Sequence, residues 1–181
     1  MNNFIDIFPT RVYKFKLNSH EEIKSQYLDS IIQSYEDNLY EVPEDWETNK
    51  ISTSFDSKQI IESVPKEYCE VFDKVFDKPW SGTVNYWHNV CKNGEYQETH
   101  HHLPAYYSAI HFLKFDNEEH MPPVFYDPNR LVNYRYASQR FTPSIKEGEV
   151  LIFPSYLEHF VPGKDYKTHR VTVSFNLTLD D

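Results

Sequence analysis

The sequence is poor in cysteine and glycine, and it contains no long apolar run. Its two cysteines, Cys69 and Cys91, make no disulfide framework, so we expect free thiols in a reducing compartment, or at most one disulfide. No stretch approaches the ~20 apolar residues that span a membrane, and the N-terminal "MNNFIDIFPTRVYKF" lacks the apolar core of a secretory signal. We therefore expect a soluble, cytoplasmic protein with no membrane partner.

Basic residues are also scarce, since 18 lysines and arginines stand against 28 acidic residues and the net charge is −10. A general nucleic-acid-binding surface needs a basic excess, so we expect no nucleic-acid partner. Aromatic residues make up 17% of the chain, which argues against disorder because their burial offsets the entropy lost on folding. A length of 181 residues suits a single domain, with residues 1–79 supporting a core of residues 80–179.

Alternating and β-branched segments predict a mainly β fold. Two segments have helical spacing instead: residues 20–35, for which Ser19 is a suitable N-cap, and residues 57–76, in which Pro65 begins a second segment. Many short strands joined by turns indicate a sandwich or barrel, and we expect the helices to pack outside it. The segments with strand patterns are 10–17, 50–55, 83–91, 96–102, 106–115, 122–128, 148–154 and 169–179.

The pair Asn93-Gly94 lies between the first two core segments. It is a strong hairpin signal, because both central residues of the tight turn need positive φ. We therefore predict that residues 96–102 return as the partner strand of residues 83–91.

Three consecutive histidines, His100, His101 and His102, raise the question of a metal site. Successive side chains of a strand point to opposite faces, so His100 and His102 would point one way and His101 the other. A third ligand must come from elsewhere in the fold. His159 stands out because it follows a buried-looking strand and a Pro-Ser turn; the other candidates are His88, His111, His120 and His169.

Arg170 lies eleven residues after His159, at the head of a strand on which Arg170, Thr172 and Ser174 share one face. The opposite face is apolar, so the arginine is expected on the polar inward face of a core strand. An unpaired buried charge is very costly. A small dicarboxylate could supply the anionic partner, held bidentately by the guanidinium.

These motifs, in this order and spacing, resemble the 2-oxoglutarate/Fe(II)-dependent oxygenases. The resemblance is closest to a branch of small oxygenases, many from phages and marine bacteria, that is related to prolyl hydroxylases. It covers residues 80–179 well and the N-terminal strand weakly. The motifs that carry it are Phe8-Pro9-Thr10-Arg11-Val12, Trp87-His88-Asn89, Gly94-Glu95-Tyr96-Gln97, His100-His101-His102, Ser108-Ala109, Phe153-Pro154-Ser155-Tyr156-Leu157-Glu158-His159 and Arg170-Val171-Thr172-Val173-Ser174-Phe175-Asn176.

The resemblance implies a double-stranded β-helix (jelly-roll) fold and an oxygenase that uses Fe(II), 2-oxoglutarate and O2. It implies that His100 and His159 bind the iron and that Arg170 binds the C5 carboxylate of 2-oxoglutarate. Further candidates for the co-substrate pocket are Thr172, Asn89 and Ser108.

Hydroxylation is the simplest outcome, and the relation to prolyl hydroxylases makes a peptidyl proline the first substrate hypothesis. The peptide would lie beside Tyr106 or Tyr107; a small-molecule substrate is the alternative. If the protein is phage-encoded, it would act in the host cytoplasm.

The chain departs from the superfamily at His102, where an acidic ligand is usual. We predict His102 as the third ligand, which leaves the site one charge unit more positive. Such a site can hold Fe(II), but it also suits zinc, copper or nickel. Two alternatives therefore stay open: a three-histidine cupin-like metalloenzyme that does not use 2-oxoglutarate, and a non-enzymatic metal-binding β-barrel module.

Overall fold

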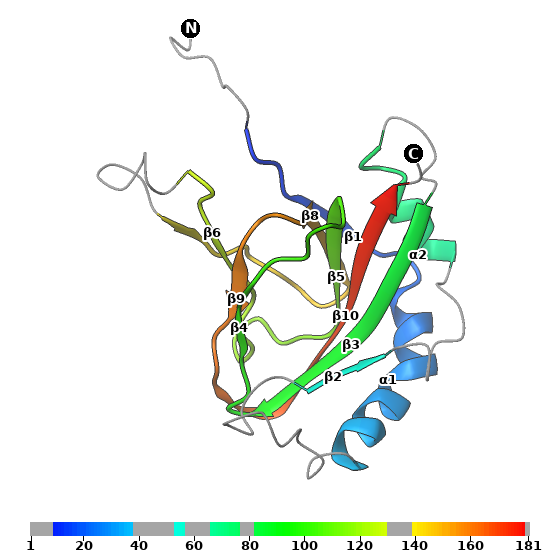
Figure 1. Cartoon of the computed structure of the whole chain (residues 1–181). Helices are drawn as coiled ribbons and strands as arrows, with labels where there is room; N and C mark the ends of the chain where they lie inside the picture. The colour runs from blue at the N-terminus through cyan, green and yellow to red at the C-terminus, as the bar shows by residue number, and fades with distance from the viewer. Residues whose placement is uncertain (1–8, 38–52, 57–65, 77–81, 130–138, 180–181) are drawn as a thin grey trace, which may run out of the picture.

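The computed structural model describes residues 9–37, 53–56, 66–76, 82–129 and 139–179. These residues form two antiparallel sheets, and two helices lie on the side of the larger sheet that is remote from the smaller one (Figure 1). The predicted mainly β class is confirmed. The predicted strand residues 50–52, the predicted helical residues 57–65 and Trp80 lie outside the described residues.

The larger sheet has six strands and is built around a long antiparallel pair, β10 and β3. Their register runs from Asp165 opposite Asn93 to Leu179 opposite Gly82, with one irregularity before Arg170. The strand order is β1 (Tyr13–Lys16), β8 (Glu149–Pro154), β5 (Tyr107–Lys114), β10 (Asp165–Leu179), β3 (Gly82–Asn93) and β2 (Thr53–Asp56).

The smaller sheet has four strands in the order β4 (Gln97–His100), β9 (His159–Val161), β6 (Val124–Tyr126) and β7 (Arg140–Phe141). Its register places His100 of β4 directly opposite His159 of β9. The sheet therefore joins two histidines that are far apart in the sequence.

Side chains of the larger sheet alternate between two apolar cores, as the strand pattern requires. On β5, Ala109 and Leu113 face the helices, whereas Ile110 and Phe112 belong to a second cluster that includes Phe125 of the smaller sheet. The first core joins the sheet to the helices. The second fills part of the space between the sheets, next to the histidines.

Helix α1 (His20–Asp37) begins where the sequence predicts, and α2 (Lys66–Phe72) begins directly after Pro65. The carbonyl of Ser19 accepts the first helical hydrogen bond from the Ile23 N–H (3.0 Å). The expected hydroxyl cap does not form, because Ser19 Oγ is buried without a hydrogen-bond partner among the described residues. No helix in the described ranges is long and apolar enough to cross a membrane.

The hairpin predicted at Asn93-Gly94 is wrong. A turn is present, with Gly94 at φ +80°, but β4 pairs with β9 in the smaller sheet rather than with β3. The buried Glu95 carboxylate accepts hydrogen bonds from the N–H groups of Lys92 (2.5 Å) and Asn93 (3.0 Å). The turn therefore carries the chain from one sheet to the other and sets the start of β4.

Candidate metal centre

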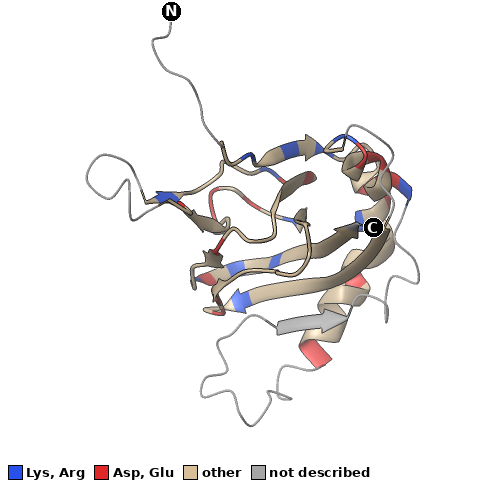
Figure 2. Ribbon diagram, turned by 45° about the horizontal axis from the view of Figure 1, so that its top comes forward, with Lys and Arg blue, Asp and Glu red and all other residues tan. Residues whose placement is uncertain are grey.

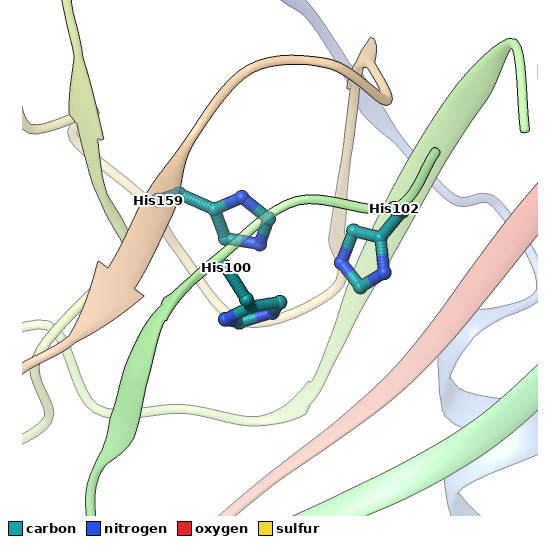
Figure 3. A group of neighbouring side chains, drawn as sticks. All are labelled: His100, His102 and His159. Atoms are coloured by element: carbon teal, nitrogen blue, oxygen red, sulfur yellow. The ribbon is translucent and has the colours of Figure 1, made fainter. Parts of the chain in front are cut away.

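Three histidines converge at the smaller sheet: His100 at the end of β4, His159 at the start of β9, and His102 just after β4. One nitrogen of each lies within 4.8 Å of the corresponding nitrogens of the other two. Figure 3 shows the three rings gathered around a common space. The structure thus brings together the three residues that the sequence predicts as ligands, at a spacing suited to one metal ion.

Backbone carbonyls orient two of the rings. His100 Nδ1 lies 2.6 Å from the Glu98 carbonyl oxygen, and His159 Nδ1 lies 3.0 Å from that of Leu157. A carbonyl only accepts, so each Nδ1 carries the proton and each Nε2 keeps its lone pair. Such a bond fixes both the tautomer and the orientation of a metal-binding histidine.

His102 reaches the centre in a different way from the one expected. Strand β4 ends at His100, so alternation along one strand does not place His102. Its backbone N–H instead donates to the Ser155 carbonyl (2.8 Å), which ties the segment after β4 to the turn after β8. The Trp87 ring packs against the imidazole of His102, with the ring centroids 5.6 Å apart.

Two of these histidines are held in the neutral form that binds metals. Burial lowers the pKa of His159 to about 3, with a smaller contribution from His100. Burial also lowers the pKa of His102 to about 4, and the neighbouring His100 and His101 add to the effect. Both rings are therefore uncharged at pH 7.

A cavity of about 220 Å³ opens beside the histidines. Apart from the histidines, the described lining contains no ionisable side chain. Figure 2 shows that basic positions lie within several strands as well as on helices and loops. A bound ion would thus find little neutralising charge in the walls. The lining residues are Trp87, Gln97, His100, His102, Ser108, Ala109, Ile110, Phe153, His159, Ser174 and Phe175.

Arg170 is buried, with 1% of its surface exposed, and it faces the space between the sheets. Its Nε donates to the Met121 carbonyl (3.0 Å), and its guanidinium lies 5.9 Å from the ring centres of both Phe112 and Phe115. Its Nη1 is buried without a hydrogen-bond partner among the described residues. A buried guanidinium with an unused donor fits an anionic ligand such as a carboxylate.

Of the predicted co-substrate residues, Ser108 is part of the described cavity lining, whereas Arg170, Thr172 and Asn89 are not. Thr172 and Asn89 are buried and directly opposite each other on β10 and β3. Ser174, one alternation further along β10, donates to Asn89 Oδ1 (3.2 Å) and lines the cavity. Ser108 also lines the cavity, and its hydroxyl lies 2.8 Å from that of Ser155.

The remaining histidines stand apart from the three-histidine cluster. His101 is exposed, and its Nδ1 accepts from the Leu103 N–H (3.3 Å). His111 bonds to His20 and Tyr68 on the helix side, and His169 lies 2.7 Å from Glu36. His120 packs against Phe115 and Tyr166, and His88 is buried in the larger sheet.

Tyr107 does not border the cavity, contrary to the expectation that either tyrosine could. Its ring contacts Tyr13 and Phe76 on the helix side, because alternation on β5 turns it away from Ser108. Tyr106 is 55% exposed, so its ring is accessible to a substrate peptide.

Sequence reasoning also missed two supporting contacts, the Ser155 carbonyl that holds His102 and the Met121 carbonyl that holds Arg170. Both use backbone atoms, so no side-chain pattern could have identified them. Trp87, by contrast, shares a strand face with Asn89, and alternation could have assigned it to the cavity.

Comparison with solved structures shows the same fold at low identity. A Pseudomonas putida prolyl-4-hydroxylase aligns with a TM-score of 0.63 at 10% identity, over 95% of this chain and 94% of that one. A Trichoplax adhaerens prolyl hydroxylase, in complex with a hypoxia inducible factor oxygen degradation domain peptide fragment, gives 0.62 at 9% identity, over 92% and 83%. The non-heme alpha ketoglutarate dependent epimerase SnoN, from nogalamycin biosynthesis, gives 0.66 at 10%, over 92% and 76%. The predicted double-stranded β-helix is thereby confirmed.

No curated protein matches this chain. The family described as "Putative 2OG-Fe(II) oxygenase" matches residues 85–176, which are 92 of the 181 residues and include all three histidines and Arg170. The cofactors of this family are Fe(II), 2-oxoglutarate and O2, and the three-histidine cluster suits the metal. The chain belongs to the 2-oxoglutarate- and Fe(II)-dependent oxygenases.

Proposed function

We propose that this oxygenase is a hydroxylase in which His100, His102 and His159 hold the iron and Arg170 holds the C5 carboxylate of 2-oxoglutarate. The observation that carries the proposal is the buried Nη1 of Arg170, which has no described hydrogen-bond partner. The guanidinium packs against Phe112 and Phe115, and these rings belong to the same apolar cluster as Phe153 of the cavity wall. When bound, Fe(II) supplies, with 2-oxoglutarate and O2, the chemistry that inserts oxygen into a C–H bond.

The side chains have separate tasks in this proposal. The Nδ1–H bonds of His100 and His159 keep each Nε2 aimed at the metal. Arg170 positions one end of the diacid and thereby directs the other end to the metal, while the hydroxyl of Thr172 and the amide of Asn89 supply polar contacts along the way. The apolar rings of Phe112 and Phe115 exclude water around the guanidinium, which strengthens its pairing with a carboxylate.

Ser108 is less suited than Thr172 or Asn89 to a direct polar contact with 2-oxoglutarate. Its hydroxyl also donates to Asn176 Oδ1 (3.0 Å), in addition to its contact with Ser155. We therefore propose that Ser108 shapes the cavity wall and contributes to the co-substrate pocket mainly through that shape.

A peptidyl proline is the substrate that we propose first. The likeness to prolyl hydroxylase structures supports this choice, one of them in complex with a peptide. Three exposed apolar side chains, Leu103, Tyr106 and Tyr156, belong to the segments that hold His102, since Ser155 bonds to both His102 and Tyr106. A peptide could pack on them while it presents a proline ring to the cavity.

The test is anaerobic reconstitution with Fe(II), followed by addition of O2 and 2-oxoglutarate with and without a library of proline peptides. We expect succinate release that a peptide stimulates and a gain of one oxygen in that peptide by mass spectrometry. Succinate without any modified peptide would point to a small-molecule substrate.

A second candidate function follows from the presence of His102 among the proposed ligands. Because a third imidazole replaces the usual carboxylate, a metalloenzyme that does not use 2-oxoglutarate would have the same ligands. Absence of 2-oxoglutarate binding to the metal-loaded protein would favour this candidate.

A further inference from the structure

His102 changes the charge of the centre, and the surroundings do not compensate. Three neutral imidazoles leave the full 2+ charge on a bound ferrous ion, whereas a carboxylate in place of one imidazole would leave 1+. The buried Arg170 adds another positive charge, against the apolar cluster that lies between the two sheets. The described walls of the cavity contribute no acidic side chain.

The bound co-substrate does not balance this charge. Under the proposed function, 2-oxoglutarate brings two negative charges against a total of three positive ones from the ion and Arg170. One positive charge stays uncompensated beside one buried and two half-buried histidines. Burying such a charge is costly unless it is paired.

We infer that the centre recruits one further anionic group beside 2-oxoglutarate, so that the preferred primary substrate carries a carboxylate or similar anion close to the position that is oxidised. The inference rests on the proposed function and adds that the substrate, whether a peptide or a small molecule, is anionic near the position that is oxidised. His102 is the residue that determines this preference.

The net charge of the protein indicates that any preference for an anionic substrate originates at the metal centre. The protein carries a net charge of −10, which disfavours anions at long range. Attraction of an anion must therefore come from the centre itself, and it should respond to a charge placed at the metal more than to one placed on the nearby surface.

The experiment uses the full chain loaded with Co(II), which reports ligand binding through its visible absorption, under anaerobic conditions with saturating 2-oxoglutarate. Azide is the anionic probe. We expect azide to bind the unaltered protein, and His102→Asp to weaken it at least tenfold while the Co(II) content is kept. His102→Gln, which offers a neutral oxygen, should weaken azide binding less than His102→Asp.

The matched control is His101→Asp, which adds the same charge one residue away on an exposed side chain. It should change azide affinity by less than twofold, because solvent screens it. Equal weakening by the two aspartates, or no weakening by His102→Asp, would overturn the inference. Failure of 2-oxoglutarate to bind at all would instead refute the proposed function, and it is measured first in the same cuvette.

A second arm tests whether an organic anion is accepted. Acetate and acetamide have nearly the same shape but differ in charge, and we expect acetate alone to displace azide. Displacement by both compounds or by neither would show that charge on an organic ligand is not what the centre selects, and the substrate class would be wrong.

Discussion

At the scale of single residues, the centre depends on how each imidazole is held. His100 and His159 are each fixed by a backbone carbonyl, at 2.6 and 3.0 Å, so their Nε2 atoms point to the cavity before any metal arrives. His102 is placed through its backbone instead. A metal ligand that is oriented in advance loses little entropy on binding, so His159 should matter strongly to metal affinity. The exposed His101, which lies outside the three-histidine cluster, should not.

The corresponding prediction compares two alanine variants. His159→Ala should abolish tight Fe(II) or Zn(II) binding, because it removes one of three ligands, whereas His101→Ala should bind metal like the unaltered protein. Metal content after gel filtration and a competition titration with a chelator measure the difference. Loss of metal from His101→Ala, with retention by His159→Ala, would refute the ligand assignment.

At the scale of elements, the turn between β3 and β4 decides where the strand that carries His100 begins. The Glu95 carboxylate accepts from two backbone N–H groups of the turn and from the Tyr35 hydroxyl of α1 (2.5 Å), and the residue is 3% exposed. This one carboxylate thus connects the helix layer, the larger sheet and the strand that carries His100.

Removal of this carboxylate should destabilise the fold more than removal of its helix partner. Glu95→Ala leaves three donors without their acceptor and should lower the free energy of unfolding by about 3 kcal/mol or more. Tyr35→Phe removes the hydrogen bond to Glu95 and the longer one from Asn93 Nδ2 (3.2 Å), and it should cost about 2 kcal/mol. Urea denaturation of both variants gives the comparison. A smaller loss for Glu95→Ala than for Tyr35→Phe would contradict this account of the turn.

The helix layer also meets the sheet at a buried polar contact. His111 of β5 is fully buried, with its Nδ1 2.5 Å from the Tyr68 hydroxyl of α2 and its Nε2 3.0 Å from His20 Nδ1 of α1. Burial, with a smaller contribution from the neighbouring His20, lowers the pKa of His111 to about 3. The contact therefore holds both helices to the sheet while His111 is neutral.

Acid should weaken this contact. The unfolded chain protonates His111 below pH 6.5 and the folded protein only near pH 3, so its contribution to stability is constant above pH 6.5 and is lost as the pH falls between these values. Between pH 7 and pH 5 the loss from this residue should be about 2 kcal/mol.

The measurement is the free energy of unfolding at pH 7 and pH 5 for the unaltered protein and His111→Gln. The variant should be less stable at pH 7 but should lose about 2 kcal/mol less between the two pH values. The other histidines are present in both proteins, so the difference reports on His111 and its contact with His20. If the free energy of unfolding changed by the same amount between pH 7 and pH 5 in both proteins, His111 would not contribute to the pH dependence of stability.

At the scale of the whole molecule, local patterns predicted the strands and the facing of their side chains. Alternation placed Arg170, Thr172 and Ser174 on the inner face of β10, where the structure has them. The choice of strand partner could not be predicted in this way, because the Asn93-Gly94 signal describes the turn and not the sheet that the chain enters next.

In the candidate site, too, local patterns were predictable from the sequence, whereas contacts between distant segments were not. The cluster of His100 with His159 follows from sheet register, which only the resemblance could anticipate. The position of His102 depends on a backbone hydrogen bond to Ser155, a residue more than fifty positions away, and the hold on Arg170 depends on the Met121 carbonyl. In both contacts the acceptor is a backbone carbonyl of a distant segment, which leaves no mark in residue identity, so they were found only in the structure.

The central claim is that Arg170 holds 2-oxoglutarate for a metal bound by the three histidines. The most direct measurement is an anaerobic calorimetric titration of 2-oxoglutarate into the Fe(II)-loaded protein, with Arg170→Ala and Arg170→Lys beside it. A carboxylate left without its buried partner loses about 3–5 kcal/mol, so Arg170→Ala should bind 2-oxoglutarate roughly two to three orders of magnitude more weakly. Arg170→Lys should fall between, because it keeps the charge without the bidentate geometry. All three should keep their Fe(II). Equal affinity of Arg170→Ala and the unaltered protein, or no binding by the unaltered protein, would contradict the account.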